Sequence, residues 1–195
     1  MEKRKLKTYT KATEYPLLVI EHDEWAENPR EWDNLGYLIT IEDRRHSPNK
    51  HEELERIVKE TGQEASNVTE HMDVIKKNFT GEKIIAIYPI YRYEHSGVAY
   101  HLGTAHGFDY SNCGFYIITD KTQKNLGTPK KSFEKVIKQE LQTYNSWVNG
   151  ETYRFTLYDK DGEIEDSCGG YYDIEHIKEA LPKEWAKENL LDYLK

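Results

Sequence analysis

The sequence predicts an α+β fold in a single domain, with a mostly antiparallel sheet and helices packed on one face. Short runs rich in β-branched and aromatic residues recur along the chain, and other stretches repeat apolar residues at spacings of three and four. These strand-like and helix-like stretches do not alternate as βαβ units would, which favours an antiparallel sheet. A chain of 195 residues has the length of one domain.

The first third of the chain supplies two strands and two helices. Residues 1–16 carry five Lys or Arg and no apolar period, so we expect a flexible basic arm before one domain over 17–195. A buried apolar strand is expected at 17–20, and a turn-rich acidic segment separates it from a second strand at 37–41. Apolar residues at spacings of three and four then predict two helices, at about 48–60 and about 64–77.

The stretch 84–119 has a strand-like run at each end, Ile84–Tyr93 and Phe115–Thr119. Pro89 cannot donate to a strand ladder, so the first run is either an edge strand or bulged. The polar and glycine-rich residues between the two runs are typical of loops that carry sites.

The last third of the chain predicts a helix, a hairpin and a helical end. A polar linker at 120–127 precedes a long helix that begins after Thr128-Pro129, and Asn149-Gly150 ends it. Alternation over 153–158 and the turn pair Asp161-Gly162 predict a hairpin. Gly169-Gly170 in the returning strand indicates a bulge or a close approach by another backbone. Ile174, Ile177 and Leu181 predict a short helix that ends before Pro182, and a last amphipathic turn or two is expected after it.

Composition and charge limit the functional classes. The net charge of −8 argues against a general binder of nucleic-acid backbones, and it permits either a basic protein partner or ordinary solubility. Cys113 and Cys168 are too few for a disulfide framework or a structural zinc site. No apolar run approaches membrane-spanning length, and the start lacks the apolar region of a secretory signal. We therefore expect a cytoplasmic chain with reduced thiols and no membrane association.

Side chains that could carry chemistry gather in the central stretch. His95, His101, His106 and Asp109 are of the types that bind zinc, but their spacing matches no standard metal motif, so loop hydrogen bonding is favoured over a metal site. The standard nucleotide-binding glycine motifs are absent, and no cofactor is expected. A nucleotide held by aromatic stacking stays open, on a surface built from five residues: Tyr88, Tyr91, Arg92, Tyr93 and Tyr100.

Three motifs together resemble a family of small proteins from phages and mobile elements of Gram-positive bacteria. They are the nonamer Asn28–Gly36 (NPREWDNLG), the Tyr-Pro-Ile-Tyr run that leads to His95-Ser96-Gly97, and Asp166-Ser167-Cys168. The resemblance spans roughly residues 17–172. Glu94 stands where the family pattern has Asp, and Ala105–Ser111 departs from its Ser-Cys-Pro-Trp-Asp-Ser-Gly stretch. The family has no established activity, so the resemblance implies a phage context and a shared set of site residues.

Two functional hypotheses follow. The first is a phage-encoded protein that binds a host factor, plausibly a component of host defence, and blocks or diverts it. The alternative is a sponge or hydrolase for a small nucleotide-like ligand. No catalytic signature favours an enzyme, and a homodimer stays open. The candidate binding residues are Trp25, Arg30, Trp32, Asp33, Asn34, His95, Ser96, Asp109, Ser111 and Asp166.

Overall fold

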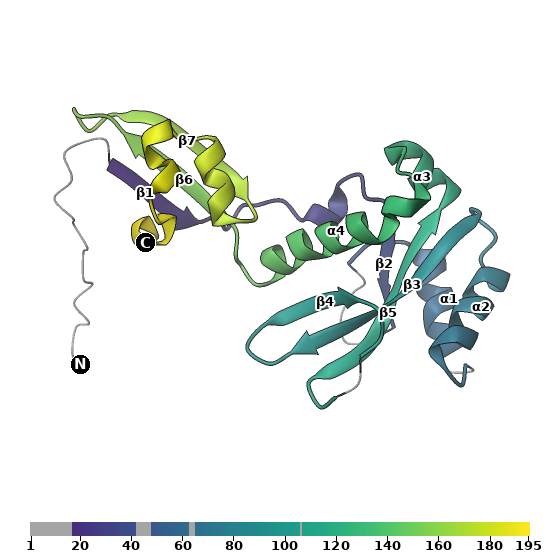
Figure 1. Ribbon diagram of the computed structural model, residues 1–195. Helices are drawn as coiled ribbons and strands as arrows, with labels where there is room; N and C mark the ends of the chain where they lie inside the picture. Colours follow the sequence, from purple (N-terminus) through teal and green to yellow (C-terminus); the bar gives the residue numbers. More distant parts are fainter. Residues whose placement is uncertain (1–16, 42–47, 63–64, 106) are drawn as a thin grey trace. The chain divides into compact units, whose positions relative to one another are not determined.

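The structure, a computed structural model, describes residues 17–41, 48–62, 65–105 and 107–195 (Figure 1). The expected N-terminal arm, residues 1–16, lies outside the described residues. The chain divides into two compact units. We call residues 27–149 the central unit, and residues 17–26 together with 150–195 the terminal unit. The chain passes between the units at two places, after Ala26 and after Asn149.

The central unit contains a four-stranded antiparallel sheet with the strand order β2-β5-β3-β4 (Figure 1). The long strand β3 (Ile84–Glu94) pairs with β5 (Tyr110–Thr119) on one side and with β4 (Val98–Leu102) on the other, and β2 (Tyr37–Thr40) lies outside β5. Pro89 is therefore in a central strand. In an antiparallel strand the N–H and C=O of one residue point to the same side. The carbonyl oxygen of Pro89 accepts from Gly103 N, just past the end of β4. The N–H that proline lacks would face the same region beyond β4, so the β3–β4 and β3–β5 ladders lose no hydrogen bond there.

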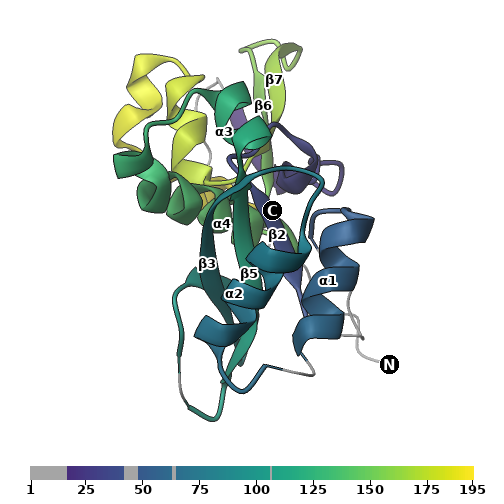
Figure 2. The same ribbon diagram turned by 90° about the vertical axis from the view of Figure 1, so that its right-hand side faces the viewer.

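Helices cover both faces of this sheet, where the sequence predicted one face. Helices α1 (Glu52–Gly62) and α2 (Val68–Asn78) lie on one face, as the turned view in Figure 2 shows. Helix α4 (Phe133–Val148) packs on the other face. Short helical segments complete the unit: η1 (Pro29–Glu31), α3 (Asp120–Leu126) and η2 (Lys130–Ser132).

Two buried clusters hold these layers together. Phe133, Ile137, Leu141 and Tyr144 lie along one side of α4 and pack against the sheet, as their spacing of three and four predicted. The opposite cluster joins α1 and α2 to strand residues on the other face. Its fully or nearly buried members are Ile39, Leu54, Ile57, Val58, Ile75, Phe79, Ile87, Phe115 and Ile117.

Asparagine side chains close both edges of the four-stranded sheet. At β2, Asn49 Oδ1 accepts from Leu38 N at 2.7 Å, and Asn49 N donates to Leu38 O at 3.2 Å. At β4, Asn145 Oδ1 accepts from Tyr100 N at 2.8 Å and Asn145 Nδ2 donates to Tyr100 O at 3.1 Å. Asn149 makes the same pair of bonds with Val98, at 2.9 and 2.8 Å. We call the side-chain carboxamides of Asn145, on α4, and of Asn149, which caps the C-terminal end of α4, the asparagine latch.

The terminal unit contains a three-stranded antiparallel sheet, with β6 (Tyr153–Tyr158) between β1 (Leu17–His22) and β7 (Ile164–Tyr171). The predicted hairpin β6–β7 is present. A register shift in β7 spans the two adjacent glycines, and Gly170 N donates to Asp23 Oδ2 at 2.8 Å, so the expected bulge is confirmed.

Three 3₁₀ segments complete the terminal unit, where the sequence predicted a short helix before Pro182 and then one or two amphipathic turns. They are η3 (Ile174–Glu179), η4 (Lys183–Lys187) and η5 (Leu190–Tyr193). Their apolar residues pack with Leu18, Ile20, Phe155 and Leu157 into one buried cluster. Both units combine helical segments with an antiparallel sheet, which confirms the α+β class. None of the helices described is long and apolar enough to span a membrane.

Candidate functional site

Within the nonamer Asn28–Gly36, a buried polar cluster is centred on Arg30, whose side chain is fully buried. Its guanidinium donates to Glu140 Oε2 at 2.8 Å, to Asn34 Oδ1 at 3.0 Å and to Gly36 O at 2.8 Å, and twice to Asn49 Oδ1. Arg30 joins the nonamer to α4 through Glu140, and Asn34 bonds to Arg30 within the nonamer, whereas the sequence predicted both as binding residues.

The buried Tyr116 ring completes this cluster. The Arg30 guanidinium lies 5.3 Å from the centre of the ring, and the Tyr116 hydroxyl donates to Glu140 Oε2. The same hydroxyl accepts from Gly36 N at 2.9 Å. Burial raises the pKa of the Tyr116 phenol well above its ordinary value, and the nearby Arg30 charge opposes that shift. The phenol therefore stays protonated and acts as a fixed donor.

The remaining candidates near the nonamer are exposed. Trp25 is 87% exposed in the terminal unit, whereas Trp32 is 45% exposed in the central unit and donates through Nε1 to Glu27 Oε2. Asp33 is also exposed. Asp166 lies on β7 in the terminal unit, where Oδ1 accepts from Ser167 N at 2.8 Å. The ten candidates are thus distributed over both units.

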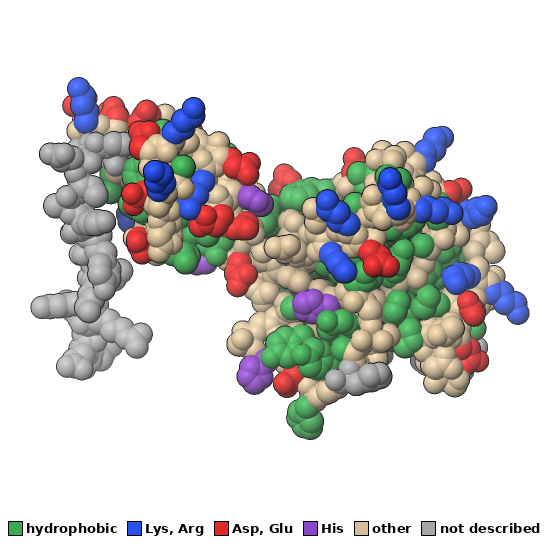
Figure 3. Space-filling model, viewed as in Figure 1, with side chains coloured by type: hydrophobic (Ala, Val, Ile, Leu, Met, Phe, Trp, Pro, Cys, Tyr) green, Lys and Arg blue, Asp and Glu red, His purple; other side chains and the backbone are tan. Residues whose placement is uncertain are grey.

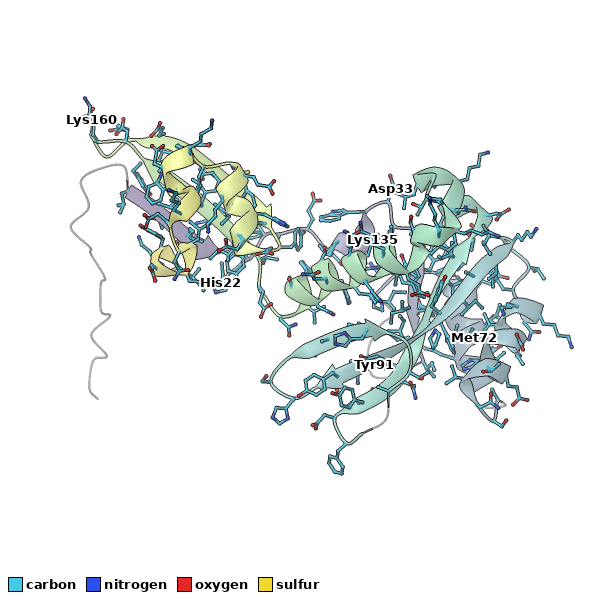
Figure 4. The ribbon with its side chains drawn as sticks, in the orientation of Figure 1. His22, Asp33, Met72, Tyr91, Lys135 and Lys160 are labelled. Atoms are coloured by element: carbon cyan, nitrogen blue, oxygen red, sulfur yellow. The ribbon has the colours of Figure 1, made fainter. Side chains whose placement is uncertain are left out.

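His95, Ser96 and Asp109 do lie near one another. The first two are in the exposed β3–β4 turn, and His95 Nδ1 is 4.0 Å from Asp109 Oδ2. Ser111 is opposite Arg92 in the ladder, so its side chain points to the other face of the sheet from His95. Asp33 lies well apart from this end of the sheet, as its position relative to Tyr91 shows in Figure 4.

A continuous row of five aromatic rings crosses the sheet beside His95. The order is His101, Tyr91, Tyr110, Tyr93 and His95. Neighbouring ring centres are 5.0, 5.9, 5.0 and 6.4 Å apart. We call this set the aromatic row. Tyr91 and His101 are cross-strand partners, as are Tyr93 and Tyr110, which explains how three strands bring the rings together.

The aromatic row lies on the α1/α2 face of the sheet, at the end that these helices leave uncovered. Side chains alternate along β3, so Tyr91 and Tyr93 share a face with Ile87, which packs under α1 and α2. Figure 3 shows hydrophobic and histidine side chains exposed together in this region. Phe108 is fully exposed and Tyr110 is 42% exposed. An uncovered aromatic surface of this kind is typical of interaction sites.

A small cleft adjoins the aromatic row. It has a volume of about 160 Å³ and lies between the start of α2 and the sheet. His71, Phe115, Pro89 and Asn112 are among its lining residues, and Asn112 is the β5 partner of Tyr91. The cleft is large enough for one side chain of a partner, and Asn112 places it next to Tyr91 of the aromatic row.

The charged groups near the aromatic row are few. Arg92 is the only Lys or Arg between residues 84 and 112; it is buried on the opposite face and donates to Glu94 Oε2 at 3.0 Å. Within the described ranges, no group of three or more His, Cys, Asp or Glu could hold a metal ion. His106 lies outside those ranges. The surface therefore offers aromatic contact area and hydrogen bonds.

The sequence predicts a stacking surface that includes Tyr91 and Tyr93, but the other residues of that predicted surface lie on the opposite face of the sheet. Tyr100 and Arg92 are buried on the α4 face, and Tyr110 takes a place in the row that the sequence does not predict. Alternation along β3 could have separated the two faces. The contribution of Tyr110 depends on the β3–β5 register, which no local pattern encodes.

The fold and this surface define an α+β protein with an exposed aromatic site. No family model, no curated protein and no solved structure matches the chain.

Proposed function

We propose that this chain is a phage-encoded accessory protein that binds a host protein through the aromatic row and blocks or diverts it. The uncovered aromatic row is the observation that carries the proposal. Tyrosine provides large contact area with few rotatable bonds, and it dominates the energetics of many protein interfaces. The resemblance described above makes a host factor the expected partner, with a component of host defence as the leading class.

A nucleotide-like ligand has less support. Asn34 contacts Arg30, which is paired with α4 on one face of the sheet, whereas His95 belongs to the row on the other face. Asn34 and His95, which such a site would combine, therefore lie on opposite faces of the sheet.

The test compares three forms of the protein as bait in lysate from the host. A double variant, Tyr93→Ala with Tyr110→Ala, removes two rings of the row, and Trp25→Ala removes a more exposed ring from the terminal unit. We expect the wild type and Trp25→Ala to enrich the same protein. The double variant should bind that purified protein at least roughly 30-fold more weakly, as expected for the loss of central aromatic contacts.

Unfolding curves of all three baits establish that the double variant is folded. Equal binding of the partner by the double variant and the wild type would refute the proposed surface. Enrichment of no specific protein by folded wild-type bait would refute the proposed function.

A further inference from the structure

The asparagine latch contains the Asn-Gly pair of this chain, Asn149-Gly150. The Asn149 side chain makes three hydrogen bonds. Nδ2 donates to Val98 O at 2.8 Å and to Asn145 O at 2.7 Å, and Oδ1 accepts from Val98 N at 2.9 Å. Both residues of the pair are exposed to water. The carboxamide is therefore accessible and at the same time fixed in position.

Asparagine followed by glycine can lose its amide without an enzyme. The backbone nitrogen of Gly150 attacks Cγ of Asn149, a new C–N bond closes a five-membered succinimide, and the bond from Cγ to Nδ2 breaks. The amide proton of Gly150 leaves with that nitrogen as ammonia. Water then opens the ring and gives either aspartate or isoaspartate. Gly150 has no Cβ, so its nitrogen is unusually open to this reaction.

We propose that Asn149 is a deamidation site that the asparagine latch controls, and that its conversion releases the edge of β4. While the latch is closed, the carboxamide must give up three hydrogen bonds before Cγ can turn towards Gly150 N. Local opening of β4 removes those bonds and exposes the reactive geometry. The latch therefore sets the rate of the reaction.

The products cannot restore the latch. An aspartate at position 149 has no donor for Val98 O or Asn145 O, so two carbonyl groups would face a carboxylate. The new charge also lies at the C-terminal end of α4, where the helix dipole disfavours an anion. Isoaspartate adds a backbone methylene and moves the side chain. Because β4 carries His101, opening this edge also disturbs one end of the aromatic row.

The rate test uses the full chain, incubated at mildly alkaline pH either folded or in urea. Mass spectrometry of the peptide that contains Asn149 measures conversion, and Asn78, which precedes the bulky Phe79, serves as the internal reference. We expect conversion of Asn149 to be roughly tenfold or more slower in the folded chain, because three hydrogen bonds protect it. Equal rates in the two states would overturn the proposal.

A matched variant separates the latch from general folding. Val98 N and Val98 O both bond to the Asn149 side chain, so they point away from β3. Val98→Pro therefore deletes the donor to Asn149 Oδ1 without removing a hydrogen bond between β3 and β4. We expect Asn149 in folded Val98→Pro to convert roughly threefold or more faster than in the wild type. An unchanged rate in the folded variant would contradict control by the latch.

Hydrogen exchange tests the release of β4. The converted protein and an Asn149→Asp variant should both exchange the amides of residues 98–102 faster than the wild type. Asn49→Asp, which changes the corresponding carboxamide at the β2 edge, should leave exchange in 98–102 unchanged. Unaltered exchange in the converted protein would show that the reaction does not open the edge, and the second half of the proposal would fall.

Discussion

Arg30→Met tests whether the nonamer cluster is structural. Methionine keeps the apolar part of the side chain but removes the guanidinium, which leaves the Glu140 carboxylate without its cation and Asn49 Oδ1 without two of its donors. The Arg30 side chain is fully buried and that of Glu140 is 16% exposed. Removing one partner of a buried ion pair costs about 3–5 kcal/mol. We expect a loss of that size in the free energy of unfolding.

The matched control is an exposed pair of the same chemistry. Arg56 and Glu60 are 2.6 Å apart, closer than Arg30 and Glu140, but their side chains are 60% and 62% exposed. Arg56→Met should therefore cost less than about 0.5 kcal/mol, because solvent screens such pairs. The comparison isolates burial from distance.

Urea unfolding of the wild type and both variants measures these differences, with fluorescence and circular dichroism as separate probes of the transition. A marginally stable unit would lose a large share of its stability through Arg30→Met. If Arg30→Met cost less than about 1 kcal/mol, the cluster would not be the structural centre described here, and Arg30 would again be a candidate for binding.

Three further predictions follow from the packing. Burial lowers the pKa of His71 below 6.5, and the hydrogen bond to Val58 O opposes this shift. Below pH 6.5 the unfolded chain therefore binds more protons than the folded chain. The contribution of neutral His71 to the free energy of unfolding should be complete above pH 6.5 and fall below it. Unfolding measured at a series of pH values should show this pH dependence in the wild type and lose it in His71→Gln. Gly114→Ala would place Cβ about 2.0 Å from Ile39 O, so we expect a loss of about 1–3 kcal/mol in chemical unfolding; an unchanged midpoint would contradict the close approach of β2 and β5. Asn145→Ala removes the two hydrogen bonds that Asn145 makes with Tyr100 N and O, and it should speed amide exchange at Tyr100 while sparing β2.

Local sequence patterns predicted helices and turns well where apolar residues followed a regular spacing or a turn pair was present. The spacing of Phe133, Ile137, Leu141 and Tyr144 predicted α4 and its buried side, and Asp161-Gly162 predicted the hairpin turn. The sequence did not predict helix α3 because six of its seven residues are polar and show no apolar period; a capping box at Thr119 and Thr122 starts it instead.

The candidate site was harder to predict because it depends on register and on which face a residue occupies. The nonamer contains charged and aromatic residues that are typical of binding surfaces, yet its arginine points inward to Glu140, which is 110 positions later in the sequence. Conversely, Tyr110 joins Tyr93 through strand pairing, and nothing near Tyr110 in the sequence indicates this. Long-range pairings of this kind are fixed by the whole sheet.

The order in which the units are encoded has a consequence for synthesis. The terminal unit needs β1 from the start of the chain and β6 from residue 153 onwards, and the whole central unit lies between them. On the ribosome, residues 27–149 therefore emerge complete while β1 still lacks its neighbour, because translation proceeds from the N-terminus. We expect nascent chains stalled soon after the central unit has left the ribosome to protect β2–β5 from proteolysis while Leu17–His22 stays open to cleavage.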